Sequence, residues 1–459
     1  MDETARRGDM ATEQDTPELT DRVEEILRGP DIEKATEAIA SIHPADRADL
    51  YERLDPELRE AFLSVLSSEE TAELLEYLEE EVREKVVGRM PRVSLARVLD
   101  KTSQDTAVDV LRTLGPAEMA RVLSIMTTAS EVTPLLEHAD ESAGGLMTRG
   151  YVALHPDMTA QQAITFLRLR KPVVEEAYYL YVLDAANRLL GVVNLRELLI
   201  SELDAPIVDV MTRDSITVKP HADQEEVARL IQHYRLRALP VVDEQGVLSG
   251  IVTADDAMEV ASEEATEDMY RMVGLLSDDS VYAPVMVSAR RRIPWLGINV
   301  ATAFVAAAMV AAFENTIAKA AALAVFMPVV AGLGGNSGVQ SITVVVRGLA
   351  LGEIKTEDAM RVLMKEGTIG LVKGVIIGLT IGVVAWAWQA EPWWGLVVGL
   401  AMLLNMLVAG LLGTVIPLGL RALKLDPAIA SGIFLTAFTD TLGFLFLLGL
   451  GALLIDKLT

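Results

Sequence analysis

An apolar run of membrane length with one acid in it constrains this chain more than any other feature. The run from Ala428 to Ile455 holds a single charged residue, Asp440, near its middle. A segment this long and apolar crosses a bilayer as a helix. A carboxylate at membrane depth costs about 3 kcal/mol even on insertion scales, so it usually faces a bundle interior or a watery path. The pattern favours an ion or proton site; the alternative is an Asp held by a neighbouring helix.

Hydroxyl side chains surround this acid. Thr436, Thr439 and Thr441 lie within one turn of Asp440, and Thr436 precedes it by one helical turn on the same face. We predict that a hydroxyl or a locally freed carbonyl at Thr436 joins the carboxylate in holding a cation or its water shell.

The charge of the chain is unevenly distributed. The 459 residues have a net charge of -26. From Arg290 onward we count nine acidic and twelve basic residues, a net of +3, so residues 1 to 289 hold the remaining -29. An acidic half of this density repels nucleic acid and gathers cations, although solubility alone would also explain it. The absence of cysteine excludes disulfides, thiolate zinc sites and cysteine nucleophiles.

The first half begins with a polar stretch and continues as a helical repeat. Residues 1–21 are polar without the apolar segment of a signal peptide, so we expect a disordered start and a cytoplasmic soluble half. Helix breaks then recur every twelve residues, at Leu54-Asp55-Pro56, Leu66-Ser67-Ser68, Leu78-Glu79-Glu80, Met90-Pro91, Thr102-Ser103-Gln104 and Leu114-Gly115-Pro116. This periodicity predicts an all-α superhelix over residues 22–139.

Two copies of a strand and helix pattern follow, over residues 140–205 and 206–255. Each copy runs from Met-Thr-Arg through a helix to a strand, a turn and a second strand, and the tandem resembles a pair of cystathionine-β-synthase (CBS) domains, an α/β fold. The second copy ends Gly250-Ile251-Val252-Thr253-Ala254-Asp255-Asp256, which matches the nucleotide-ribose signature of that family. The first copy lacks the matching Thr and Asp. The resemblance therefore leaves ATP open as a ligand of the second half-site, at Thr253 and Asp256.

Residues 256–289 are predicted to form one connecting helix. Its first part is densely acidic and its later part is apolar up to Arg290. Such a helix transmits motion from a regulatory pair to a membrane span, or is an inert linker.

The second half is predicted to contain five membrane helices, at residues 294–317, 320–346, 367–389, 393–419 and 428–455. Basic residues gather in the loops of one side, which places the N-terminus inside and the C-terminus outside. Residues 332–341 interrupt the second span with glycines and polar residues. Because irregular backbone at membrane depth must be buried in protein or line a cavity, we predict a pore-lining break that includes Asn336. Asn405 in the fourth span lines the same space or bonds across helices.

The order of these parts resembles the MgtE family of magnesium channels: an acidic helical N domain, a CBS pair, a connecting ("plug") helix and five spans. The segments 140–148, 334–340 and 426–440 carry the resemblance most specifically. It implies a homodimer in the lipid bilayer of the inner membrane, with the two copies of Asp440 holding a hydrated Mg²⁺ in a pore on the twofold axis. Mg²⁺ suits this arrangement because it keeps most of its water.

The resemblance also implies cytosolic sites at which Mg²⁺ regulates the channel. It places sensing acids at Glu73, Asp105, Asp109, Asp223, Glu225, Asp256, Glu259, Glu264, Glu267 and Asp268, with Asp426 near the inner mouth. Arg235 stands where an acid would supply a further ligand in the second CBS helix. At low Mg²⁺ the acidic surfaces repel and the pore opens, and at high Mg²⁺ the ion bridges them and the pore closes.

Other functions are less favoured by the sequence. A broader divalent transporter for Co²⁺, Mn²⁺ or Ni²⁺ stays open. In the chloride-channel family the CBS pair follows the membrane domain, and Asp440 would repel an anion. We expect no enzyme activity, because an intramembrane hydrolase needs a second catalytic group at depth and no Walker motif is present.

Overall fold

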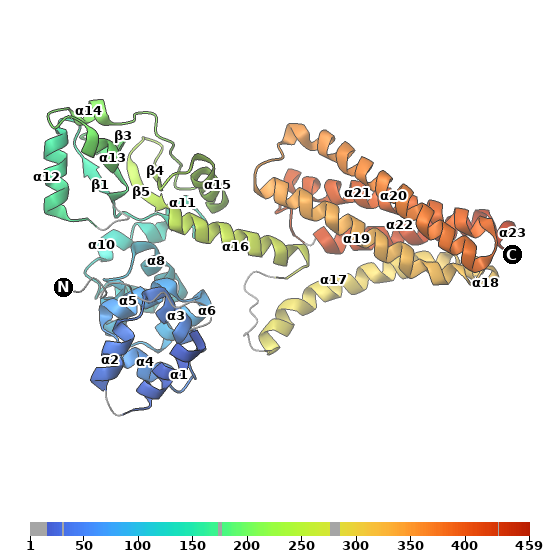
Figure 1. Cartoon of the computed structure of the whole chain (residues 1–459), viewed down its shortest axis with the longest axis horizontal. Helices are drawn as coiled ribbons and strands as arrows, with labels where there is room; N and C mark the ends of the chain where they lie inside the picture. Colours follow the sequence, from blue (N-terminus) through green and yellow to red (C-terminus); the bar gives the residue numbers. More distant parts are fainter. Residues whose placement is uncertain (1–15, 30–31, 173–176, 276–284, 430) are drawn as a thin grey trace, which may run out of the picture. The chain divides into compact units, whose positions relative to one another are not determined.

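The computed structural model describes residues 16–459 except 30–31, 173–176, 276–284 and 430 (Figure 1). Contacts divide the chain into two compact units, Met1–Val260 and Ala261–Thr459. Each unit is described by itself. The finer boundaries at residues 21, 139, 205, 255 and 289 remain predictions.

The first unit begins with short helices, as the twelve-residue spacing predicts. They are α1 (Thr16–Leu27), α2 (Ile32–Ala40), α3 (Pro44–Arg53), α4 (Arg59–Val65), α5 (Ser68–Tyr77), α6 (Glu80–Arg89), α7 (Arg92–Leu99), α8 (Gln104–Thr113), α9 (Pro116–Leu123), α10 (Ala129–Val132), η1 (Leu135–Glu137) and α11 (Ala143–Leu146). Leu54, Leu66, Leu78, Met90 and Leu114 are C-caps, and Ser103 is the N-cap of α8, which confirms the predicted breaks. The predicted disordered start is wrong over residues 16–21, because α1 begins at Thr16; residues 1–15 lie outside the description.

Most helices of the repeat pack on the next but one, as α3 on α5 and α5 on α7. Carboxylates reinforce this pairing. Glu52 accepts a hydrogen bond from the backbone N–H of Glu79 (3.1 Å), and Glu76 accepts one from that of Ser103 (2.7 Å). Asp100 accepts from the N–H groups of Thr127 and Thr128. Glu52, Glu76 and Asp100 follow one another at intervals of two repeats. Each accepts from backbone N–H groups at or next to the start of a later helix, which would otherwise lack a partner.

The CBS pair completes this unit. The first copy has β1 (Val152–Leu154), α12 (Ala160–Arg170), β2 (Tyr179–Leu183), β3 (Leu189–Asn194) and α13 (Leu195–Ile200), and the second has α14 (Ile207–Val210), α15 (Gln224–Tyr234), β4 (Ala238–Val242) and β5 (Leu248–Thr253). β2 pairs antiparallel with β3, and β4 with β5. Each copy lends its leading segment to the other: Thr148 bridges Ile251, and Thr212 bridges Val192. The predicted tandem α/β fold is therefore confirmed.

The connecting helix is shorter than predicted. Helix α16 spans Ala254–Met272, and Gly274 beyond it has a φ of +74°. The backbone N–H groups of Gly274 and Leu275 bond back to Arg271 and Tyr270, which closes the helix end. The prediction of one continuous helix to residue 289 is wrong here; residues 276–284 lie outside the description, and α17 has begun by Val285.

The second unit contains five helices long and apolar enough to cross a membrane. They are α17 (Val285–Ala312), α19 (Leu323–Ala350), α20 (Ala359–Gln389), α21 (Pro392–Ala422) and α22 (Ser431–Leu453). The short helices α18 (Glu314–Lys319), η3 (Thr356–Asp358) and α23 (Ile455–Leu458) flank them. The number and order of spans agree with the sequence, but α17 includes the basic residues 290–292 and Pro294, so it begins before the apolar run.

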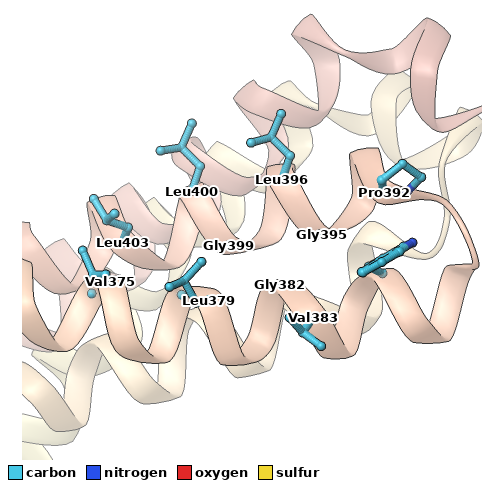
Figure 2. Close-up of a pocket in the computed structure, with 13 residues that line it drawn as sticks. Val375, Leu379, Gly382, Val383, Pro392, Gly395, Leu396, Gly399, Leu400 and Leu403 are labelled. Carbon is cyan, nitrogen blue, oxygen red and sulfur yellow. The ribbon is translucent and has the colours of Figure 1, made fainter.

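Helices α20 and α21 pack unusually closely through facing glycines. A Cβ at Gly378 would lie 2.7 Å from the carbonyl oxygen of Gly399, and one at Gly382 would lie 2.8 Å from that of Gly395. Figure 2 shows the apolar groove that this close approach leaves beside Leu379 and Leu400. Small residues at such a crossing replace hydrophobic burial with close backbone packing, as membrane helices require.

Candidate ion-conducting site

Asp440 lies on α22, at the edge of the face that is buried against the neighbouring helices. Thr439 before it is fully buried, whereas Asp440 is half-buried. Within the described part of the chain, no side chain or backbone N–H bonds to the Asp440 carboxylate, and no cation pairs with it. The sequence left open a structural Asp held by a neighbouring helix, and no such bond is present among these residues. Among the described residues, the Asp440 carboxylate therefore has no hydrogen-bond donor or cation to neutralise it.

The neighbouring hydroxyls bond to their own helix. Thr436 is exposed and donates to the carbonyl of Gly432 (2.8 Å), and Thr439 donates to the carbonyl of Leu435 (3.0 Å). Their donor hydrogens are thus occupied, but each hydroxyl oxygen keeps lone pairs for a cation or its water. The role predicted for Thr436 stays a prediction.

The predicted break in the second span is wrong. Residues 332–341 lie inside α19, which is α-helical from Leu323 to Ala350. The glycines there allow neighbouring helices to approach: a Cβ at Gly338 would lie 2.5 Å from a methyl carbon of Leu435, and one at Gly334 would collide with the Asn405 amide. Glycine marks close packing in this helix rather than irregular backbone.

Asn405 joins three helices. It is fully buried on α21, and its Nδ2 donates to the carbonyl of Val330 on α19 (2.9 Å). A Cβ at Gly443, one turn beyond Asp440 on α22, would lie 2.8 Å from the same nitrogen. Of the two roles open for Asn405, the structure shows the bond across helices. Asn336, in contrast, is exposed on α19.

Two polar residues of the membrane unit escaped the sequence analysis. Lys373 lies within α20 and its Nζ donates to Gln340 on α19 (3.0 Å). Glu366 is buried near the start of the same helix, beside Lys365. A count of all charges within the apolar runs, rather than of acids alone, would have found Lys373.

The helical repeat and the second CBS copy bring two predicted sensing acids together. Asp256 accepts hydrogen bonds from the hydroxyl (2.6 Å) and the N–H of Thr253. Burial, followed by the charge of Asp105, raises the pKa of Asp256 to about 7. Burial also raises the pKa of Asp105 itself. An added cation would relieve the repulsion between these two carboxylates.

The remaining acids of the first unit are more dispersed. Burial raises the pKa of Asp109 to about 6, with Arg83 opposing the shift from 4.0 Å. Glu73 pairs with the buried Arg47 (3.5 Å). Asp223 caps α15 by accepting from the N–H of Glu225 (2.9 Å). Arg235 ends that helix in the left-handed conformation, with a φ of +53°.

The remaining predicted sensing acids lie along α16 and in the loop before α22. Glu259 is exposed. Burial, then Asp426 and Glu264, raise the pKa of Asp268 to about 6. Arg271 pairs with both Glu267 and Asp426. Among the described residues, no three acidic or histidine side chains are gathered closely enough to hold a bare metal ion. The predicted sensing acids thus occur as a few neighbouring acids and several separate ones, and in the described residues they do not form a complete metal site.

Family models match three parts of this architecture: the helical repeat, the CBS pair and most of the membrane helices. The model of the divalent cation transporter MgtE matches residues 327–450, and that of the MgtE intracellular N domain matches residues 42–141. The CBS domain model matches residues 143–203 and 207–263. The matches follow the same order along the chain as the parts described above.

Individual relatives agree with these models. The magnesium transporter MgtE of Thermus thermophilus is 38% identical over 333 residues, which is 72% of this chain and 73% of that protein. That of Enterococcus faecalis is 37% identical over 312 residues, or 68% and 69% of the two chains.

Solved structures extend the likeness to the fold. The soluble part of a magnesium transporter matches with a TM-score of 0.51 at 31% identity, covering 55% of this chain and 99% of that chain. The cytosolic domain of the Mg²⁺ channel MgtE in complex with ATP matches with a TM-score of 0.50 at 36% identity, covering 52% and 99%. The chain belongs to the MgtE family of magnesium transporters.

Proposed function

We propose that this protein is a Mg²⁺-selective channel that mediates magnesium uptake across the inner membrane. The observation that carries the proposal is the carboxylate of Asp440, which lies within a span of membrane length and has no partner among the residues that the structure describes. A membrane potential contributes about 2.3 kcal/mol per elementary charge per 100 mV, so a divalent cation enters without ATP hydrolysis. Mg²⁺ holds its water tightly and binds through one or two carboxylates, which fits a lone acid better than a many-ligand cage.

The pore is proposed to lie between two copies of the chain. Asp440 and Thr436 are accessible at the surface of a single membrane unit, as is Asn336. A second copy would enclose them and supply a second carboxylate. The CBS pair also offers an apolar contact surface: α12 and α13 pack together and leave Leu169, Leu199 and Ile200 between 63% and 80% exposed. Such a patch in an otherwise acidic unit favours self-association.

Intracellular Mg²⁺ is proposed to close the channel through the soluble acids. Asp105 and Asp256 suit this role, since burial disfavours the charged form of both and the charge of Asp105 adds to this effect at Asp256. An ion between them would stabilise one arrangement of the first unit. ATP at the second CBS copy is proposed from the relative solved with that nucleotide and from Thr253 and Asp256, although Thr253 here bonds to Asp256.

Ion flux in liposomes tests the pore assignment. Asp440→Ala should abolish Mg²⁺ uptake while the purified protein keeps its assembly size, because the pore loses its fixed charges. Asp440→Asn should conduct weakly and lose its preference for divalent over monovalent cations. Asp456→Asn on α23 removes one charge from the same unit outside the long spans and serves as the control. Normal Mg²⁺ flux in the alanine variant would exclude Asp440 as the site.

A broader divalent transporter is the second candidate, and the divalent cation description of the matching family model favours it. Competition of Co²⁺, Mn²⁺ and Ni²⁺ against Mg²⁺ in the same liposomes distinguishes the two. Equal flux for all four ions would favour the broader function.

A further inference from the structure

Arg271 links the end of α16 to the loop that precedes α22. Its Nη1 donates to Oδ2 of Asp426 at 2.5 Å, and its Nη2 pairs with Glu267 one turn earlier on α16. The other oxygen of Asp426, Oδ1, accepts from the N–H of Ala428 (2.7 Å). Both oxygens of Asp426 are therefore engaged, one by the local turn and one by the guanidinium.

The same contact coincides with apolar packing of the helix end. Met272, next to Arg271, packs in a cluster with the fully buried Ala428 and Leu435 and with Ile342. The carbonyl of Met272 would lie 2.7 Å from a Cβ at Gly432, so the backbone of α16 approaches α22 closely. Arg271 thus stands where the last turn of α16 meets the membrane helices.

The surrounding charge makes this docking costly without a cation. Glu264, Glu267, Asp268 and Asp426 share the region, and burial followed by the charges of Asp426 and Glu264 raises the pKa of Asp268. Neighbouring carboxylates repel unless a positive charge lies among them. A guanidinium provides that charge permanently, with a planar fork that holds two carboxylates.

We propose that Arg271 is a positioning residue that acts as a built-in cation: it holds the end of α16 against the α21–α22 loop when no divalent ion is bound. This inference rests on the proposed gating by Mg²⁺ and adds that part of the neutralisation at this junction comes from the protein itself. Arg271 occupies Glu267 and Asp426, two of the acids proposed to respond to Mg²⁺. Mg²⁺ would then bind where the end of α16 already contacts the α21–α22 loop through Arg271.

The chain has no cysteine, so a single introduced thiol reports on this junction. Ala428→Cys places a small thiol at a fully buried position under Met272. In full-length protein without Mg²⁺, maleimide should label this thiol slowly. Adding Arg271→Gln should accelerate labelling about tenfold, because two part-buried charge pairs are lost, and millimolar Mg²⁺ should restore the slow rate. Restoration by the ion distinguishes lost neutralisation from a misfolded junction.

Two matched variants complete the test. Arg271→Lys keeps the charge without the fork and should label at an intermediate rate. Arg97→Gln removes an exposed arginine of α7 and should label like the parent. In liposomes, Arg271→Gln should raise the Mg²⁺ concentration that halves flux, whereas Arg97→Gln should not.

Equal labelling of Arg271→Gln and its parent without Mg²⁺ would overturn the proposal. A lower closing concentration in Arg271→Gln would also overturn it, since Arg271 would then be a competitor of Mg²⁺. The labelling measures docking without flux, so it gives an answer even if Asp440→Ala conducts normally. Failure of the pore assignment and failure of this inference are thus separate results.

Discussion

Asp256 on α16 lies close enough to Asp105 on α8 for the second carboxylate to disfavour ionisation of the first. Burial is the larger cause, and together they raise the pKa of Asp256 to about 7. In the unfolded chain both acids ionise near their ordinary values. The unfolded state therefore loses these protons at lower pH than the folded state does. The resulting destabilisation is absent below about pH 4 and grows until the pH passes about 7.

Asp256→Asn should remove this pH-dependent cost while retaining an oxygen to accept from Thr253. At pH 8 we expect the melting temperature of the soluble part of the full-length protein to rise by a few degrees over wild type, and at pH 4 we expect no gain. Circular dichroism of the detergent-solubilised protein measures both. Asp255→Asn, which changes an exposed neighbour, is the control. A gain of equal size at both pH values would contradict the electrostatic cause.

Neutralising acids along α16 should impair closure by Mg²⁺. A Gln variant at Glu259, Glu264 and Glu267 relieves repulsion but also removes proposed ligands, and we expect ligand loss to dominate because coupling needs differential binding. The variant should conduct at Mg²⁺ concentrations that close the wild type and lose Mg²⁺ protection of α16 from protease. Gln at the exposed Glu57, Glu60 and Glu84 removes the same charge elsewhere. If both triple variants close like wild type, the α16 acids are a solubilising surface.

The contact between Asn405 and Gly443 should set the position of the turn that carries Asp440. Gly443→Ala brings a methyl to 2.8 Å from the buried amide, so we expect lower thermal stability and reduced Mg²⁺ flux. Asn405→Ala in the same chain makes room and should recover part of the flux. Gly449→Ala is the control on α22, because its nearest neighbour is 4.0 Å away. No recovery in the double variant would argue against a direct steric conflict.

The charge bias of the loops predicts where the two ends lie. A reporter enzyme fused after Thr459 should be active outside the cytoplasm, and one fused before Asp2 should be active inside it. If all five long helices cross the membrane, the two ends lie on opposite sides. Activity of both fusions on one side would mean that one of the five long helices does not cross.

Hydropathy was sufficient to predict five spans, because apolar length is a local property of the sequence. It misplaced the start of α17, since a helix continues past the membrane edge through residues such as Arg290 to Arg292. It also misread residues 332–341 as a break. Glycines occur both in irregular backbone and where helices pack closely. The position of Asn405 on another helix shows that close packing is the reason here, and the sequence does not give that position.

Pairs made by distant parts of the chain were beyond sequence reasoning. Arg271 and Asp426 are 155 residues apart, and nothing local marks Arg271 as different from other basic residues. The sequence was enough to select candidate sensing acids, but not to explain their pKa values. Family resemblance picked out Asp105 and Asp256, but the cause of their raised pKa values is burial, which depends on the folded unit.

The carboxylate caps of the helical repeat divide its acids into two populations. The carboxylates of Glu52, Glu76 and Asp100 accept hydrogen bonds from backbone N–H groups of later turns. Although burial opposes it, hydrogen bonding by Thr128 and Thr127 lowers the pKa of Asp100. These three acids stabilise the superhelix through hydrogen bonds to backbone amides. If they bound an ion instead, those hydrogen bonds would be lost. The proposed response of residues 1–289 to Mg²⁺ would therefore rest on acids other than these three, and their charge should be left out when the -29 charge is taken as a measure of Mg²⁺ capacity.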